Sequence, residues 1–361
     1  MEEGQLPGAV ALLARRGKIA FFESFGARDG EQGAPMTRDA IFRIASMSKP
    51  ITSVAVMMLA EEGRFLLSDP ISRYLPELGK LEVALDDKRV PAVREITIQD
   101  LLRHTSGLTY GFFGNSAVDK LYLEQGVFTR DANLAETVAK LGKLPLKHQP
   151  GTTWEYSVSV DVLGRLVEVV SGLPFDRFLR ERMFEPLEMR DTDFNVPARE
   201  LSRVAALYES DGNGGIRQVQ PQGVQDLAKP VGYFSGGGGL VSTARDYARF
   251  AQMLLEEGAL DGHRLLGRKT VELMRSDHLG PISFPRHPGY GFGLGFAVRT
   301  APGLAPIASS VGEYHWGGAY GTGFWIDPAE QLIGVFMAQL RPSPRPFAEE
   351  FKALAYQAIV E

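Results

Sequence analysis

The stretch Phe42-Arg43-Ile44-Ala45-Ser46-Met47-Ser48-Lys49-Pro50 decides how this chain is interpreted. Residues 51–62 show helical spacing of apolar residues. A proline is tolerated only in the first turn of a helix because it lacks an N–H, so the helix is expected to begin near Ser46. Lys49 then lies one turn further along the same face, which brings an amine within reach of the Ser46 hydroxyl.

A serine at a helix N-terminus beside a lysine has two interpretations. Free backbone N–H groups favour negative charge there, and a nearby amine lowers the cost of forming an alkoxide, so Ser46 is a candidate nucleophile. Alternatively, Ser46 caps the helix and Lys49 is solvated. With 20 serines and 11 lysines in 361 residues, chance gives about 0.6 Ser-x-x-Lys pairs, and this pair is the only one in the chain. The motif alone does not decide between the two interpretations.

A second candidate is Tyr156, in the segment Trp154-Glu155-Tyr156-Ser157-Val158. It precedes residues 157–170, which show helical spacing of apolar residues. A tyrosine held partly as phenolate beside a lysine serves as a general base. The alternative is a tyrosine that anchors the start of the helix with its ring in the core.

A third candidate segment is Tyr314-His315-Trp316-Gly317-Gly318, at the start of a predicted strand. Paired glycines on a strand let a substrate approach the backbone, and an N–H group there completes an oxyanion hole. The alternative is a β-bulge beside a buried tryptophan.

Composition and missing motifs exclude several functions. The net charge of −5 and the pI near 5.8 disfavour nucleic acid and anionic membrane surfaces as partners. The chain has no cysteine, no HExxH, no GxxxxGK[ST] and no GxSxG. We therefore expect neither a metal nor an organic cofactor. Because no stretch approaches the roughly 18 apolar residues of a membrane span, and residues 1–18 do not resemble a signal peptide, we expect a cytoplasmic protein.

The order of predicted elements indicates an insertion architecture. Strand candidates lie at both ends of the chain (residues 9–15, 19–25, 289–299, 321–326 and 332–340), and residues 346–360 form a final helix. Residues 51–62, 98–103, 132–141, 157–170, 175–183 and 244–257 favour helices. The pattern predicts an α/β domain of residues 1–55 and 285–361, with a mostly helical domain, 56–284, inserted in it. A ligand is expected in the cleft between them.

The ordered set Ser46-x-x-Lys49, Tyr156-Ser157-Val158 and His315-Trp316-Gly317 resembles the serine β-lactamase and penicillin-binding-protein superfamily. The resemblance is strongest to class C β-lactamase-like carboxylesterases, the family VIII esterases. Supporting phrases are Phe42-Arg43-Ile44-Ala45, Leu101-Leu102-Arg103-His104-Thr105-Ser106-Gly107-Leu108 and Gly239-Leu240-Val241-Ser242-Thr243.

This resemblance implies a fold and a site. The fold is α/β plus all-α: an antiparallel sheet built from both termini, flanked by helices, with a mostly helical inserted lobe. Ser46 is then the acylated nucleophile, Lys49 and Tyr156 activate it, and the N–H groups of Ser46 and Gly318 form the oxyanion hole. Which of Lys49 and Tyr156 is the base stays open, because they titrate as a coupled pair.

Two departures from the lactamase pattern bear on the substrate. Val158 stands where the lactamases carry asparagine, and His315 and Trp316 replace the lysine and threonine of Lys-Thr-Gly. Both changes remove polar groups that hold a β-lactam or D-Ala-D-Ala, which favours neutral esters.

Other residues are candidates for the substrate pocket. His315, Trp316 and Gly317 line it if the resemblance holds, and the loop aromatics Tyr110, Phe112, Phe113, Tyr233 and Tyr320 are candidates for an acyl or alcohol pocket. Asp161 resembles an acid of the esterase branch that tunes Tyr156, but we favour a solvated helix carboxylate.

The sequence therefore predicts a serine carboxylesterase that hydrolyses neutral, short-chain esters through an acyl-enzyme, with a small-molecule ester as its partner. A β-lactamase or D-Ala-D-Ala peptidase, an acyltransferase of the same fold and a non-catalytic scaffold remain alternatives. The oligomeric state stays open.

Overall fold

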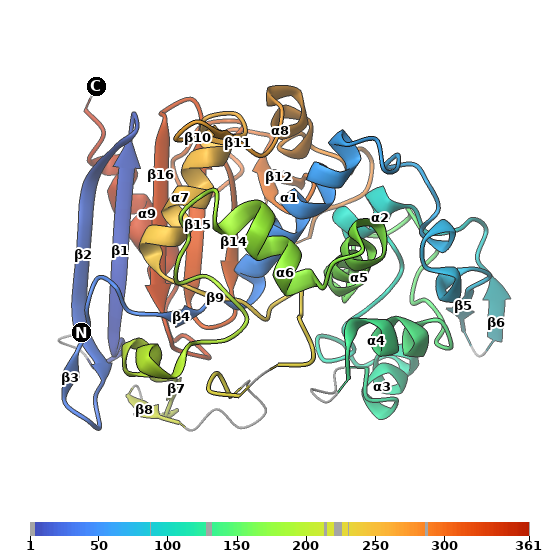
Figure 1. The fold of residues 1–361 in the computed structure, drawn as a ribbon, viewed down its shortest axis with the longest axis horizontal. Helices are drawn as coiled ribbons and strands as arrows, with labels where there is room; N and C mark the ends of the chain where they lie inside the picture. Colours follow the sequence, from blue (N-terminus) through green and yellow to red (C-terminus); the bar gives the residue numbers. More distant parts are fainter. Residues whose placement is uncertain are drawn as a thin grey trace.

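Both ends of the chain meet in one antiparallel sheet. The computed structural model describes residues 4–86, 88–127, 132–212, 215–219, 226–229, 231–285 and 288–360. In these ranges the main sheet has eight strands in the order β12-β13-β14-β15-β16-β1-β2-β3 (Figure 1). Their bounds are β1 Gly8–Arg15, β2 Lys18–Asp29, β3 Ala34–Pro35, β12 Tyr290–Phe292, β13 Ala297–Arg299, β14 Tyr314–Gly318, β15 Thr322–Asp327 and β16 Leu332–Ala338.

Pairing of β1 with β16 joins the two ends. The register runs from Ala9 opposite Ala338 to Arg15 opposite Leu332. The predicted hairpin of residues 9–25 is β1 and β2, which turn at Arg16 and Gly17 with positive φ angles of 52° and 72°. The predicted sheet built from both termini is therefore confirmed.

Helices cover both faces of this sheet. α7 (Ala244–Leu255) packs on β1, β15 and β16, and α9 (Phe347–Gln357) packs on β15 and β16 from the opposite side (Figure 1). Side-chain alternation along β15 separates the faces: the Phe324 ring lies 4.9 Å from Tyr247 of α7, and the Trp325 ring lies 5.7 Å from Phe351 of α9. The apolar core is thus layered about the sheet.

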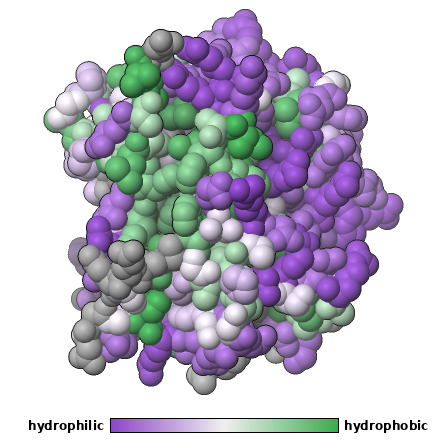
Figure 2. Space-filling model, turned by 90° about the vertical axis from the view of Figure 1, so that its left-hand side faces the viewer, coloured by the Kyte–Doolittle hydropathy of each residue, from purple (hydrophilic) through white to green (hydrophobic). Residues whose placement is uncertain are grey.

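The other edge of the sheet is exposed. β3 covers only the C-terminal end of β2, where it pairs with Ala27 and Asp29. Figure 2 views the molecule from this side and shows apolar surface gathered there. Ile19 and Phe25 of β2 and Leu354 of α9 are exposed apolar side chains.

The middle of the chain is mostly helical. The long helix α1 (Ser48–Glu61) is buried along most of its length and packs against α5 (Ser159–Ser171). Gly63, Gly172 and Gly258, which lie just beyond α1, α5 and α7, all have positive φ angles, as is common where a helix ends. The remaining helices are α2 Ile98–Leu102, α3 Ala117–Glu124, α4 Leu134–Leu141, α6 Phe175–Leu179 and α8 Arg268–Met274.

Short elements complete the fold. 3₁₀ turns span Ala45–Met47, Ile71–Arg73, Pro76–Leu78 and Ala198–Arg203, and a π-helical turn, Arg180–Phe184, follows α6. The small strand pairs are β4 Phe42–Arg43 with β9 Val241–Ser242, β5 Glu82–Leu85 with β6 Lys88–Pro91, β7 Tyr208–Ser210 with β8 Ile216–Gln218, and β10 Ala259–Leu260 with β11 His263–Arg264. No helix of the described ranges has both the length and the hydropathy to cross a bilayer.

The domain boundaries proposed from the sequence stay a prediction. α7 belongs to the range 56–284 but packs on the sheet. The cleft-forming helices α1 and α5 come from both proposed units, because α1 crosses the boundary at residue 55.

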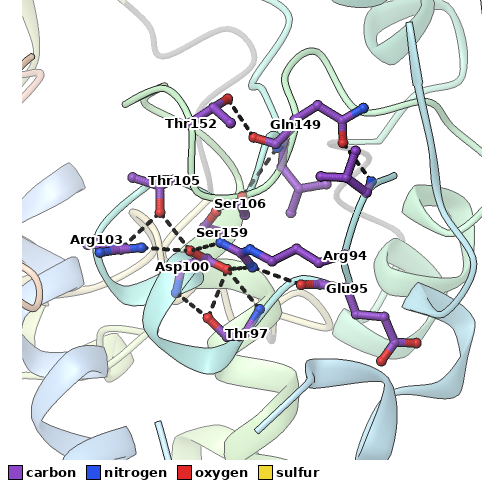
Figure 3. Close-up of polar contacts among 12 residues, drawn as sticks. Arg94, Glu95, Thr97, Asp100, Arg103, Thr105, Ser106, Gln149, Thr152 and Ser159 are labelled. Atoms are coloured by element: carbon purple, nitrogen blue, oxygen red, sulfur yellow. Dashed lines mark hydrogen bonds and ion pairs between the residues drawn. The ribbon is translucent and has the colours of Figure 1, made fainter. Parts of the chain in front are cut away.

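A buried carboxylate organises the loop that follows α2. The Asp100 side chain is fully buried, and it accepts hydrogen bonds from Arg94 Nη1 (2.5 Å), Arg103 Nη2 (3.0 Å) and the hydroxyl groups of Thr97 (2.8 Å) and Thr105 (2.9 Å) (Figure 3). Burial opposes ionisation of Asp100, but these donors outweigh it and lower its pKa to about 2. The charge thus holds residues 94–105 together.

We expect the protein to lose stability in acid through Asp100. Its folded pKa lies below the ordinary value of 3.8, so the ionised group adds about 2 kcal/mol to the free energy of unfolding at neutral pH. This contribution is complete above about pH 4 and is lost as the pH falls through about 2. Asp100→Asn should lower the free energy of unfolding by about 3 kcal/mol at neutral pH, because two arginines then face an amide. Urea denaturation at pH 7 and about pH 3 measures both effects, and the difference between the proteins should shrink by about 1 kcal/mol at the lower pH.

Asp261→Asn is the matched control. Asp261 is 62% exposed and pairs with Arg249 Nη2 at 2.6 Å. A surface ion pair contributes little, so we expect a change below about 0.5 kcal/mol. Equal effects of the two substitutions would contradict the role assigned to Asp100.

Candidate active site

Ser46 lies in a sharp turn ahead of α1. Ala45 adopts a left-handed conformation with φ of 45°, which is uncommon for a residue other than glycine. The Ser48 hydroxyl holds this turn by donating to the Ala45 carbonyl (2.7 Å) and accepting from the Leu240 N–H (3.1 Å). Ser46 is partly exposed between the buried Ala45 and Met47. The turn thus presents the Ser46 hydroxyl to a cavity, and the helix begins where Pro50 predicted.

Lys49 contacts Ser46 from the first turn of α1. Its Nζ lies 3.2 Å from Ser46 Oγ and donates to the Gly237 carbonyl at 2.7 Å. The side chain is 1% exposed, so the alternative of a solvated lysine is wrong. Its Nζ also lies 4.4 Å from the ring centre of Tyr156 and 5.2 Å from that of Tyr110, where the π faces attract a cation.

Tyr156 completes the group. It stands just before α5, is 7% exposed, and its Oη accepts a hydrogen bond from Trp316 Nε1 at 3.4 Å. The three residues named from separate parts of the sequence therefore come together, with the Tyr156 ring between Lys49 and Trp316.

The loop after Asp100 supports Tyr156 from behind. Thr105 and His104 accept backbone hydrogen bonds at their carbonyl groups from Gly151 (2.7 Å) and Glu155 (2.9 Å), and the His104 ring lies 5.0 Å from the Tyr156 ring. The segment Leu101–Leu108, which shares the family's sequence pattern, thus supports the segment that contains Tyr156.

Asp161 lies inside the protein, contrary to the expectation of a solvated carboxylate. It is 1% exposed and accepts hydrogen bonds at Oδ1 from Ser235 Oγ (2.6 Å) and the Gly237 N–H (3.4 Å). The expectation failed because the glycine-rich loop, some 75 residues further along the chain, packs over this side of α5. Burial raises the pKa of Asp161 despite these hydrogen bonds and the nearby Lys49 charge.

This arrangement links Asp161 to Lys49 through one residue, Gly237. Gly237 donates its N–H toward Asp161 and accepts from Lys49 at its carbonyl. A side chain at Gly237 would have its Cβ 2.6 Å from Asp161 Oδ2 and 2.7 Å from Tyr110 Oη, so only glycine fits. The contact orients the Lys49 amine rather than Tyr156.

The end of β14 approaches the Ser46 turn from the sheet. A Cβ at Gly318 would lie 2.3 Å from the Ile44 carbonyl oxygen and 2.2 Å from Thr322 Oγ1, so a glycine is required for this close approach. β14 and β15 pair one to one from Tyr314 to Gly318, so the alternative of a bulge is wrong. β13 pairs only with Tyr314 and His315, which leaves the end of β14 facing the site.

Two cavities meet at Ser46. The first, of about 570 Å³, and the second, of about 410 Å³, share the wall residues Ser46, Phe113, Tyr156 and Ala319. The candidate pocket residues divide between them. Tyr110, Phe112, Asp161, Tyr233 and Tyr320 line the first, and His315, Trp316, Gly317 and Gly318 line the second.

Sequence reasoning missed several groups around the site. Ser235 and Gly237 were not named, although the run of four glycines at 236–239, ahead of a predicted helix, is a signal that could have pointed to them. Glu313 and Lys352, which lie around the second cavity, carried no signal in the sequence. A single charged residue on a strand or in a terminal helix is ordinary there.

A serine hydroxyl in contact with a buried amine, in a turn that faces the end of a strand, is the arrangement of a serine hydrolase. The profile of the Beta-lactamase family matches residues 1–359. This protein belongs to that family.

Relatives of known activity cover most of the chain. Esterase EstB of Burkholderia gladioli is 34% identical over 91% of this chain and 85% of its own length. The solved structure of EstCE1, described as a hydrolase with promiscuous acyltransferase activity, superposes with a TM-score of 0.84 at 28% identity, covering 98% of this chain and 94% of that chain. Simvastatin synthase LovD of Aspergillus terreus superposes with a TM-score of 0.82 at 25% identity, over 100% of this chain and 96% of that chain. The recognised family and fold class are thus confirmed.

We expect an alkyl fluorophosphonate to label Ser46. The reagent traps an activated serine, so Ser46→Ala should abolish labelling, and Lys49→Met should slow it by about a hundredfold or more because the amine next to Oγ is lost. Intact-protein mass spectrometry follows the rate, and peptide mapping finds the position. The exposed Lys269→Met, which breaks a surface pair with Glu272, is the control and should label at the wild-type rate. Labelling elsewhere, or an unchanged rate in Lys49→Met, would contradict the assignment.

The link from Asp161 to Lys49 gives a separate expectation. Asp161→Asn keeps the volume but removes the charge that orders the Gly237 peptide, so labelling of Ser46 should slow by about tenfold. Ser235→Ala, which removes one hydrogen bond to Asp161, should act in the same direction and less strongly. Thermal unfolding of both variants separates this effect from loss of fold. Wild-type labelling rates in both would rule out the positioning role.

Proposed function

We propose that this protein is a serine carboxylesterase that hydrolyses neutral, short-chain esters through an acyl-enzyme on Ser46. The observation that carries the proposal is the 3.2 Å contact between Lys49 Nζ and Ser46 Oγ at the junction of two cavities. A water-accessible nucleophile with room on both sides suits a substrate that has one group on each side of a carbonyl.

In the first step Ser46 Oγ attacks the ester carbonyl carbon and gives its proton to the Lys49–Tyr156 pair. The N–H groups of Ser46 and Gly318 stabilise the negative oxygen of the tetrahedral intermediate. Its C–O bond to the alcohol then breaks, and the proton passes to the leaving oxygen through Tyr156. Water attacks the acyl-enzyme by the same route in reverse, which releases the acid and restores Ser46.

The polar groups that hold a lactam are replaced in this site. Val158 is fully buried in the core, so it presents no amide to a substrate. The Trp316 indole is committed to Tyr156, and His315 is held by Glu313 at 3.1 Å. The first cavity has aromatic rings on its wall, including Tyr110, Phe112 and Phe113, beside the cations Arg43, Lys229 and Arg341. The replaced polar groups and the aromatic rings favour neutral esters.

The relatives support ester chemistry and point to one alternative. The name of EstB describes an esterase, which agrees with hydrolysis. EstCE1 is described as a hydrolase with promiscuous acyltransferase activity, so a second candidate function is transfer of the acyl group to an alcohol in place of water. Adding an acceptor alcohol and measuring the ester formed against the acid released separates the two.

Kinetics on paired substrates test the proposal. We expect p-nitrophenyl esters of short acyl chains to be hydrolysed with a kcat/KM at least about a hundredfold above that of the lactam nitrocefin, because the site has lost the groups that bind a lactam carboxylate. Ser46→Ala should lower kcat/KM for the ester by about a thousandfold or more, since the covalent step is lost.

The exposed variant Lys269→Met again serves as control. A Ser46→Ala protein with wild-type activity would show that the nucleophile is another residue. Faster turnover of nitrocefin would overturn the preference for esters, and product found mainly as the transferred ester would favour the acyltransferase.

A further inference from the structure

The wall of the second cavity combines apolar residues with buried polar and charged groups. Phe113, Trp316, Pro306, Ile307 and Trp325 are apolar wall residues, whereas His315, Lys352 and Tyr290 carry polar atoms. The three polar residues surround Glu313, and we call Glu313 and these three residues the Glu313 cluster.

Four elements or loops contribute to the contacts of Glu313. Its carboxylate accepts from Lys352 Nζ of α9 (2.7 Å), Tyr290 Oη of β12 (2.9 Å), His315 Nδ1 of β14 (3.1 Å) and Ser309 Oγ of the intervening loop (3.2 Å). Glu313 is fully buried. The carboxylate only accepts, so His315 carries its hydrogen on Nδ1. The cluster is therefore a rigid, satisfied arrangement.

Stability does not explain why the ion pair of Glu313 and Lys352 is buried. Removing two charges from water is expensive, and apolar residues of similar size are often at least as stabilising. Burial opposes ionisation of Glu313, but its contacts with His315 and Lys352 outweigh burial and lower its pKa to about 2, so the carboxylate is charged. Lys352 of this charged pair lines the same cavity as Ser46, which points to recognition of a ligand.

Lys352 is the group suited to contact a ligand. Its ammonium has three N–H donors, and the short contact to Glu313 uses one of them. The side chain is 6% exposed, yet it forms part of the cavity wall. A ligand oxygen there receives a charge-assisted hydrogen bond in a place shielded from water.

The charges favour a neutral oxygen over an anion. Glu313 already balances Lys352, and a second carboxylate, Glu349, also lines the cavity. A carboxylate ligand thus meets two negative groups, whereas a ketone, ether or hydroxyl oxygen accepts from Lys352 without adding charge.

We propose that the second cavity selects esters whose chain in that cavity ends in a neutral hydrogen-bond-accepting oxygen, which Lys352 of the Glu313 cluster binds. The inference rests on the proposed ester hydrolysis at Ser46 and names the class of substrate. The preferred ester therefore carries, besides the ester group itself, a neutral acceptor oxygen at the end of its acyl chain or of its alcohol chain.

Isosteric substrates test this directly. One p-nitrophenyl ester has an acyl chain ending in a methyl ketone, and its partner ends in a methyl branch in place of the ketone oxygen. A graded series of chain lengths places the oxygen at different depths. A second series carries the same two ends on the alcohol of an acetate ester, which shows whether acyl or alcohol enters the cavity. At the matching length we expect the ketone to raise kcat/KM by about tenfold or more.

Substitutions identify the responsible group. Lys352→Met combined with Glu313→Gln removes both charges and keeps their volumes, so the ratio of kcat/KM for the ketone ester to kcat/KM for the branched ester should fall to about one. Tyr290→Phe removes one hydroxyl from the cluster and should weaken the preference if the double variant fails to fold. Lys269→Met combined with Glu272→Gln is the matched control. These two residues form a solvent-exposed ion pair with a distance of 2.6 Å, and their replacement should leave the preference for the ketone unchanged.

The outcomes separate this inference from the proposed function. Hydrolysis of both esters without any preference in either series would overturn the inference and leave the esterase intact. A preference retained in the double variant and in Tyr290→Phe would also overturn it. If the wild-type protein hydrolyses none of these esters, the proposed esterase function is refuted, and this inference with it.

Discussion

A buried amine beside a serine is the constraint on which the rest of the site depends. Lys49 has its head group shielded from water, and burying a cation is unfavourable unless other groups replace its hydration. The Gly237 carbonyl, the faces of Tyr156 and Tyr110, and the Ser46 hydroxyl do this together. Each of these groups comes from a different part of the chain, so the amine requires the glycine-rich loop, the tyrosine segment and the first turn of α1 to meet. Folding and assembly of the site are therefore the same event.

Carboxylates behind the site act mainly by holding other groups in place. Asp100 holds the loop that supports Tyr156. Asp161 positions Gly237, whose carbonyl accepts a hydrogen bond from Lys49. Glu313 binds side chains from β12, β14 and α9. Each is buried and accepts hydrogen bonds from at least two donors, which makes its surroundings rigid. A hydrolase that works by geometry needs this rigidity, because a small displacement of an attacking group lowers the rate strongly.

Much of the fold was predictable because it follows from local patterns. The hairpin of β1 and β2, the long helices α1, α5 and α7, and the helix-ending glycines are strongly periodic or carry a clear turn signal, and the structure confirms them. The short helices α3 and α8 and the small strand pairs such as β5 with β6 were missed. They have eight residues or fewer, so their periodicity is weak, and tertiary contacts rather than local preference stabilise them.

By itself the sequence determined the candidate residues Ser46, Lys49, Tyr156 and Gly318, the strand-forming ends and the helical middle, since these follow from spacing and side-chain chemistry. Only the tertiary structure decided that Lys49 and Asp161 are buried, that Gly237 joins them, and that two cavities meet at the serine with Lys352 on the wall of one. The physical reason is that burial and cavity shape depend on which distant segments pack together. Asp161 and Ser235, for example, are 74 positions apart in the chain but in direct contact. A one-dimensional pattern contains the chemistry of each side chain but not the identity of its neighbours.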